Sequence, residues 1–254
     1  MVWYLPNAVY AGQTTWSAGA AIERQILTET GRSGATLVEE TGWLPVLSLG
    51  GHHVLADGYL QGGLSYTDSN LDYDGQSQNG QAATSLSGHH RLRLSLGYGR
   101  PVAADWDVSG HFEYERLDRD IRGVDDLAGM SERYRALRVV ARLGHVTTVM
   151  RRPARVELAV SYGLDGRQQV ASPGVIDPVE LPMGKAWGIG GSLDVELGHL
   201  AMGGPVWHLT PSLAYRHAAR SDNRPWTANG FYRGVIAQPE TAVWEAGLGI
   251  RADW

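Results

Sequence analysis

The chain lacks cysteine, has only 2 phenylalanines among its 254 residues, and has no apolar run long enough to cross a membrane as a helix. Without cysteine it can form no disulfide, no thiolate nucleophile and no cysteine-ligated zinc site. A net charge of -5 and an isoelectric point near 6.0 provide no basic surface for nucleic acid. Residues 1–6 lack the basic and apolar regions of a signal peptide, so we expect any export signal to have been removed or replaced.

Glycine and the amphipathic aromatic residues are abundant instead. The sequence contains 33 Gly, 9 Trp and 11 Tyr. Tryptophan and tyrosine rings are typical of boundaries where one edge of the ring meets water and the rest meets an apolar phase. This composition favours β-structure with many turns and an interface that needs rings with a polar edge.

Residues 106–115 carry a clear alternation with period two. The even positions, beginning with Trp106, are apolar or glycine, and the odd positions, beginning with Asp107, are polar. Such alternation predicts a strand with one apolar and one polar face. The phase inverts at Arg116 and Leu117, which indicates that the strand either leaves the apolar layer there or carries a bulge.

The same alternation recurs along the whole chain, for example over 156–165, 187–197 and 242–254. It predicts about ten antiparallel strands and no helix of convincing length. The predicted strands cover residues 14–28, 37–54, 58–72, 86–99, 105–119, 132–147, 154–166, 185–199, 205–218 and 241–254.

Short and long connections alternate between these strands, and nothing marks a domain boundary. Because consecutive strands run in opposite directions, the alternation places the long polar loops at one end. We expect residues 1–13 to form an N-terminal periplasmic or lumenal segment and residues 14–254 to form one barrel. The short links are 56–57, 100–104, 151–153 and 202–205, and the long ones are 74–85, 120–131, 166–184 and 219–240, with 30–34 as a short exception.

In these features the chain resembles a bacterial outer-membrane β-barrel: an even number of strands, short turns opposite long loops, alternating faces and a terminal aromatic residue, Trp254. The resemblance implies an all-β, antiparallel up-and-down transmembrane barrel of about ten strands, with twelve left open. It further implies short periplasmic turns, long extracellular loops and a place in the outer membrane of a Gram-negative bacterium. Its expected partners are outer-membrane lipid, lipopolysaccharide, the insertion machinery and an extracellular ligand.

A soluble barrel or sandwich is the competing interpretation, with the apolar face turned inward. Aromatic pairs on the apolar face argue against it. Eight to ten residues at about 3.3 Å each, tilted by roughly 40°, span about 20 to 25 Å, the distance between the aromatic girdles of a membrane barrel. The predicted girdle comprises Trp106, Tyr114, Tyr162, Trp187, Trp207, Tyr215, Trp244 and Trp254.

The polar face is expected to line the lumen. Ten strands enclose little more space than eight, and the acids and bases on this face nearly balance. We therefore predict a lumen plugged by ion pairs rather than a conducting pore. The predicted network comprises Arg91, Arg93, His111, Glu113, Glu115, Arg138, Arg142, Glu157, Glu196, Arg216 and Glu245, and the same face includes Glu23, His52, Asp194, His208 and Arg251.

Catalytic and metal signatures are weak. The 9 histidines show no spacing typical of a metal site, so we predict no metal and no cofactor. Asp72 and Asp74 could imitate the aspartate pair of omptin proteases, but no Asp-x-His follows, and no His-x-Ser of a lipid A deacylase occurs. We therefore assign no catalytic residues and disfavour an enzyme.

Acidic residues gather near the predicted long loops, where they form a solvated rim that could bind Ca²⁺ bridging lipopolysaccharide phosphates. The expected function is surface binding and recognition, or a role as an anchor or assembly partner. The alternatives are the translocator of an autotransporter or a larger exporter, and an outer-membrane hydrolase. The rim comprises Asp68, Asp72, Asp74, Asp118, Asp120, Asp125 and Asp126.

Overall fold

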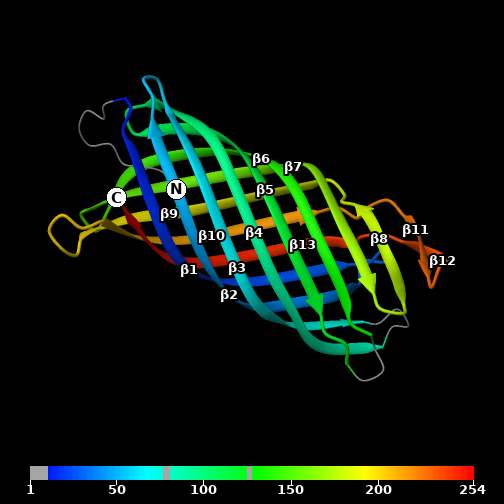
Figure 1. Cartoon of the computed structure of the whole chain (residues 1–254). Coiled ribbons are helices and arrows are strands. Elements are labelled where there is room, and N and C mark those ends of the chain that lie inside the picture. The colour runs from blue at the N-terminus through cyan, green and yellow to red at the C-terminus, as the bar shows by residue number, and fades with distance from the viewer. Residues whose placement is uncertain (1–10, 77–80, 125–127) are drawn as a thin grey trace.

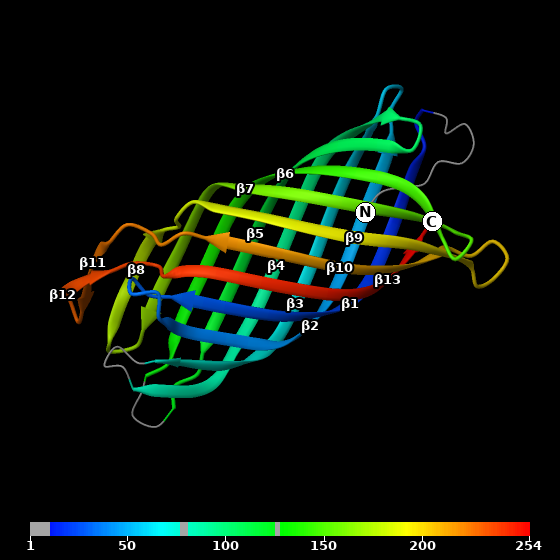
Figure 2. The same cartoon turned by 180° about the vertical axis from the view of Figure 1, so that it is seen from behind.

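The computed structural model describes residues 11–76, 81–124 and 128–254, and these form a closed antiparallel barrel of ten strands (Figures 1 and 2). Residues 1–10 of the predicted N-terminal segment lie outside the described part. The wall strands are β1 (Thr14–Thr30), β2 (Thr36–Val54), β3 (Tyr59–Gln76), β4 (Ala82–Ala103), β5 (Trp106–Ile121), β6 (Met130–Val149), β7 (Arg152–Ser172), β9 (Ala186–His199), β10 (Val206–Ala218) and β13 (Glu240–Asp253).

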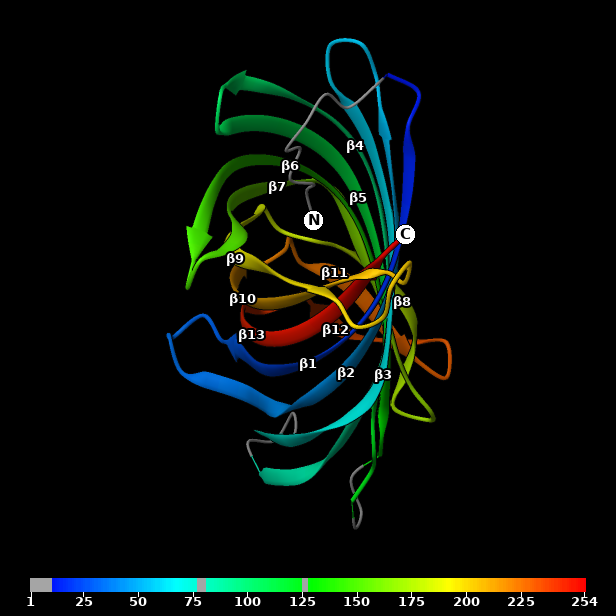
Figure 3. The same ribbon diagram turned by 90° about the vertical axis from the view of Figure 1, so that its left-hand side faces the viewer.

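The first and last wall strands close the barrel. β1 pairs with β13 from Ser17↔Asp253 to Thr30↔Glu240, and the remaining wall strands pair with their neighbours around the ring (Figure 3). Closure leaves no open edge in the wall, which is the condition for a sheet to reside in lipid. The predicted ten-strand, up-and-down antiparallel barrel is confirmed.

The apolar face of the wall points outward. Leu47, Leu96 and Leu158 are between 57% and 65% exposed, whereas the alternating polar side chains of Gln25 and Glu245 are at most 7% exposed. A soluble barrel has the opposite arrangement, because its apolar side chains must leave water. The soluble interpretation is therefore wrong.

β5 extends beyond the apolar layer, and its side chains keep the same alternation between outward and inward positions. Arg116 and Asp118 continue the outward row, while Leu117 and Ile121 continue the inward row. Because the pairing of β5 with β6 shows no register shift, the phase inversion is not a bulge. The strands therefore extend beyond the apolar band, and in that part the chemistry of the two faces is exchanged.

The loop end has a small apolar interior that reflects this exchange. Val38, Tyr73 and Ile121 form a buried cluster, with Leu37 and Met130 packed against it. They belong to β2, β3, β5 and β6, at the strand ends that lie opposite the C-terminus (Figure 1). This part of the molecule has an ordinary hydrophobic core.

Two of the predicted long loops contain additional strands. β7 continues to Ser172 and pairs with β8 (Ile176–Pro182), and β11 (Arg224–Ala228) pairs with β12 (Phe231–Ile236) in a separate hairpin. The expected loop 74–85 is also mostly strand, since β3 and β4 extend into it from both sides. The length and polar composition of these segments predicted loops instead.

The wall is irregular where β7 passes from one partner to the other. Its pairing with β9 ends at Tyr162↔Trp187, and its pairing with β8 begins at Arg167↔Pro182. On the other side of β7, the register with β6 shifts so that Leu164 is an extra residue, a β-bulge. In the described part of the chain, no helix is long and apolar enough to cross a membrane.

Candidate functional site

The middle of the lumen holds a cluster of four arginines and three glutamates, called here the middle cluster. Arg216 donates to Glu115 at 2.9 Å and to Glu245 at 2.6 Å, and Arg93 Nε donates to Glu115 at 2.5 Å. Arg93, on β4, also reaches Glu245, on β13, so the ion pairs cross the lumen. The members are Glu23, Arg91, Arg93, Glu115, Arg138, Arg216 and Glu245.

A second network, the loop-end cluster, surrounds Arg119. Its guanidinium contacts Glu29 at 2.7 Å, Glu40 at 2.9 Å and Glu132 at 2.6 Å, and its side chain is 1% exposed. His89 lies 2.7 Å from Glu40. One arginine and a histidine thus face three carboxylates in a buried site.

Sequence reasoning missed the loop-end cluster. Arg119 follows Glu113 and Glu115 at even spacing, so it lies on the same inward row of β5. That spacing was the available signal. It was obscured because the neighbouring inward residues Leu117 and Ile121 are apolar, as expected for an outer face.

Two further groups lie at the turn end of the lumen. Arg155 forms a bidentate ion pair with Asp107, which also accepts a hydrogen bond of 2.6 Å from the Tyr59 hydroxyl. Arg251 contacts Asp194 at 2.5 Å and Asp253 at 2.8 Å. These pairs are called the turn-end groups.

The structure brings most of the predicted lumen residues into such contacts. Between the middle cluster and the turn end, Arg142 contacts Glu113 at 2.8 Å and Glu157 at 3.3 Å. His111 instead contacts Ser109 at 3.0 Å. Glu196 lies on the inward row of β9, and none of the described side chains forms an ion pair with it.

The predicted aspartate rim is not brought together. Asp68, Asp72 and Asp74 face outward on β3, Asp118 and Asp120 face outward on β5, and β4 separates the two groups. Within the described ranges no three acidic or histidine side chains are arranged to hold a metal ion. Asp125 and Asp126 lie outside the described residues.

The predicted girdle residues all lie on the outward rows, and several contact one another. Trp187 and Tyr215 have ring centroids 5.4 Å apart, and Tyr215 and Trp244 have centroids 4.6 Å apart. Tyr114 and Tyr162 lie on the loop side with these three, whereas Trp106, Trp207 and Trp254 lie near the turn end. The prediction omitted Trp16 and Trp43, which are also exposed on the outer face.

Among the described residues, the middle cluster separates two cavities inside the barrel. The central cavity, about 440 Å³, is bounded by Arg93 and Arg216 on one side and by His111 and Arg142 on the other. Glycine, serine and alanine from the surrounding strands line much of it. Side chains do not fill the lumen uniformly, since small residues leave open space between the charged layers.

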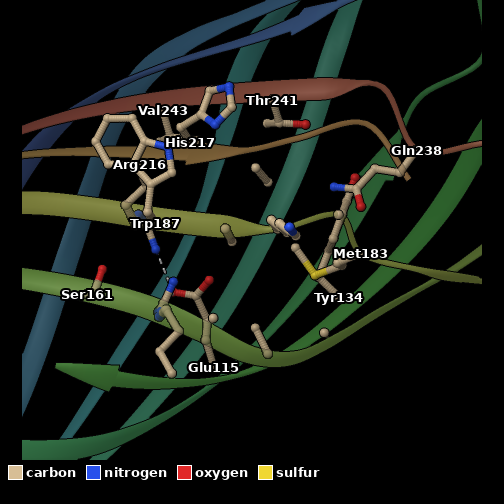
Figure 4. Close-up of a pocket in the computed structure, with 18 of the residues that line it drawn as sticks. Glu115, Tyr134, Ser161, Met183, Trp187, Arg216, His217, Gln238, Thr241 and Val243 are labelled. Atoms are coloured by element: carbon tan, nitrogen blue, oxygen red, sulfur yellow. Dashed lines mark hydrogen bonds and ion pairs between the residues drawn. The ribbon is translucent and has the colours of Figure 1, made fainter. Parts of the chain in front are cut away.

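The upper cavity, about 320 Å³, lies on the loop side of the middle cluster (Figure 4). Arg216 and Glu115 line it on one side, and Gln238 and Met183 line it on the other. It extends to the wall irregularity at residues 163–166. This cavity combines charged groups, apolar walls and a connection to the outer surface.

A polar contact outside the barrel ties two loop hairpins together. Asp177 on β8 accepts hydrogen bonds from the backbone N–H of Gly230 at 2.9 Å and from the Thr227 hydroxyl at 2.7 Å. These hydrogen bonds hold the pKa of Asp177 below its usual range, and the bond from the Gly230 N–H has the largest effect.

Neither protein-family models nor curated proteins match the sequence. The crystal structure of outer membrane protease OmpT from Escherichia coli is similar over 95% of this chain and 96% of that chain, with a TM-score of 0.60 and 6% identity. The translocator domain of autotransporter NalP from Neisseria meningitidis is similar over 95% of this chain and 88% of that chain, with a TM-score of 0.51 and 14% identity. At these identities the likeness establishes the fold, that of a bacterial outer-membrane β-barrel.

Proposed function

We propose that the protein is a non-conducting outer-membrane barrel that binds a ligand at its loop end rather than passing solutes. The observation that carries this proposal is that ion pairs cross the lumen at two levels, in the middle cluster and in the loop-end cluster. The Arg93–Glu245 contact and its neighbours lie in the path of an ion moving through the barrel. Separating such a pair leaves two buried charges without partners, which is unfavourable and supports a closed arrangement.

The two alternatives are less well supported by the geometry. A translocator needs room for a chain segment within the lumen, whereas the middle cluster joins opposite strands across it. An omptin-like protease needs its aspartates and histidine to face one cleft. Asp72 and Asp74 face outward from β3, and His217 lies across the ring on β10.

We further propose that an arginine row on the outer face contacts lipopolysaccharide phosphates. Arg116 pairs in register with Arg135, and Arg135 with Arg167, on three neighbouring strands. Like charges directly opposite one another across strands are destabilising. Arg116 contacts Asp118 at 2.8 Å and Arg167 contacts Glu180 at 2.8 Å, whereas Arg135 has no ion pair among the described residues. A phosphate bound between these side chains would offset the repulsion.

Single-channel recording in planar bilayers tests the closed lumen. The parent protein is expected to show no steady conductance, and the double variant Arg93→Ala with Arg216→Ala is expected to open. Arg100→Ala, on the outer face, is the matched control and should remain silent. A large steady conductance of the parent protein would overturn the proposal.

A further inference from the structure

We propose that the upper cavity binds an aliphatic carboxylate that also carries a hydroxyl group, and that this ligand enters through the wall between β7 and β9. The proposal deepens the binding function above and rests on it. Four features of the cavity support it: a cationic floor, apolar walls, buried polar atoms without partners and an opening at the level of the outer aromatic side chains.

The floor of the cavity has an excess of positive charge. Arg91, Arg138 and Arg216 line it together with Glu115. Across the whole middle cluster, four arginines face three glutamates. Arg216 Nε is buried and has no hydrogen-bond partner among the described residues. A carboxylate is the group that satisfies both the charge and this donor.

The walls above the floor are largely apolar. Side chains from β1, β5, β6 and β13 contribute, and Met183 and Trp187 contribute from the β8–β9 side. A space of about 320 Å³ lies in the range of small-molecule sites and can enclose an alkyl chain. The apolar lining comprises Leu27, Leu117, Ala136, Leu164, Pro182, Met183, Ala186, Trp187, Ala218 and Val243.

Gln238 supplies the second polar contact. Its side chain lines the cavity and the residue is 2% exposed, yet its Oε1 accepts no hydrogen bond from any described group. Buried polar atoms are nearly always paired, so an unpaired amide oxygen on a residue that lines this space indicates a missing donor. In Figure 4, Gln238 and Met183 lie on one side of the space and Arg216 and Glu115 on the other. A ligand hydroxyl can donate to Gln238 while its carboxylate accepts from Arg216.

The wall irregularity provides the entrance. Between the last β7–β9 pair and the first β7–β8 pair, the Met183 N–H donates to the Gly166 carbonyl at 2.8 Å. The cavity lining includes Leu164, Asp165 and Lys185, all exposed on the outer surface. Tyr162 and Trp187 flank this opening. An amphiphile collects at such a membrane–water boundary, where its charged head and apolar tail are both accommodated.

Radiolabelled 3-hydroxydecanoate, decanoate and inorganic phosphate are suitable probes, with the whole protein held in lipid nanodiscs. The parent protein should bind 3-hydroxydecanoate saturably, bind decanoate about tenfold more weakly, and not bind phosphate alone. Gln238→Leu should remove the preference for the hydroxylated acid. Arg216→Gln should weaken the binding of both acids.

Two matched variants separate the upper cavity from general effects on the barrel. Ala136→Phe fills the upper cavity and should abolish saturable binding, whereas Ala159→Phe, which faces the central cavity, should leave it intact. If the parent and Ala136→Phe take up both acids equally and without saturation, the uptake is partition into lipid, and the proposed site is overturned. Conductance is measured in a separate experiment. A barrel that shows no conductance and binds neither acid would refute this inference but leave the proposed closed lumen standing.

Discussion

The membrane-facing part of the wall and the loop-end part are built from the same strands with opposite chemistry. On β5, the outward row is apolar at Val108 and Phe112 and charged at Arg116 and Asp118. The inward row changes in the reverse sense, from Glu113 to Ile121. The register of β5 does not change along the strand, so the same rows keep facing outward and inward. The change in residue chemistry therefore follows the change in what lies outside the barrel. Outward side chains match lipid along one part of the strand and water along the other.

The inward charges of the two parts also differ in how many partners they have. In the membrane part, inward charges have many partners of both signs, as in the middle cluster. In the loop-end part, a single guanidinium, Arg119, holds three carboxylates beneath an apolar cluster. The loop-end cluster therefore depends on one residue, whereas the middle cluster shares its contacts among several.

The largest expected effect comes from removing Arg119. Arg119→Ala leaves Glu29, Glu40 and Glu132 buried without their common cation, which should lower the free energy of unfolding by about 3–5 kcal/mol. Urea unfolding of the protein folded in liposomes measures this change. Arg116→Ala, three residues away on the outer face, is the control and should change stability by about 1 kcal/mol or less. Equal losses in both variants would show that the inner and outer rows do not differ as described.

A smaller effect is expected from a charge on the outer face. Leu248→Arg places a guanidinium in the apolar band, where it should destabilise the barrel by about 2–4 kcal/mol if the residue lies near the bilayer midplane. Gln169→Arg introduces the same group on the outward row of the loop-end part, where water solvates it. Unfolding in the same liposomes should show almost no change for Gln169→Arg. A tolerated Leu248→Arg would contradict the outward-facing apolar band.

The same contrast separates what the sequence predicts from what it does not. Period-two alternation located all ten wall strands and the middle cluster, because most of the outward residues beside these inward charges are apolar, as at Arg93, Arg138 and Glu245. It did not locate Arg119, Glu40 or His89. In the loop-end part the inward row of β5 mixes apolar and charged residues, while the outward rows of β3 and β5 are polar, so an apolar residue no longer marks the outer face.

The loop hairpins were missed for a different reason. Asp177 and Thr227 are 50 residues apart, and the contact between them is not encoded in either local pattern. The upper cavity likewise depends on residues from distant strands and on the irregular pairing of β7. Such features arise from the closed topology, and local periodicity does not contain them.

The proposed lipid contact tests the boundary between the two parts. Arg135→Gln combined with Arg167→Gln should reduce the lipopolysaccharide retained by the purified protein several-fold, because two of the three phosphate donors are lost. Native mass spectrometry of the detergent-extracted protein measures the retained lipid. Arg100→Gln is exposed near the turn end and should leave retention unchanged. Unchanged retention in the double variant would remove the arginine row from the proposal.

The smallest effect is expected outside the barrel, at Asp177. Its hydrogen bonds favour the charged carboxylate, so its pKa is lowered relative to the unfolded chain. The contribution to stability is therefore present above the ordinary pKa of about 4 and is lost as the pH falls through the lowered value. Asp177→Asn should remove this pH dependence and increase deuterium exchange at residues 224–236 without changing exchange in the wall strands. Asp222→Asn, in the same connection, should exchange like the parent, and identical exchange in Asp177→Asn would show that the hairpin is held by other contacts.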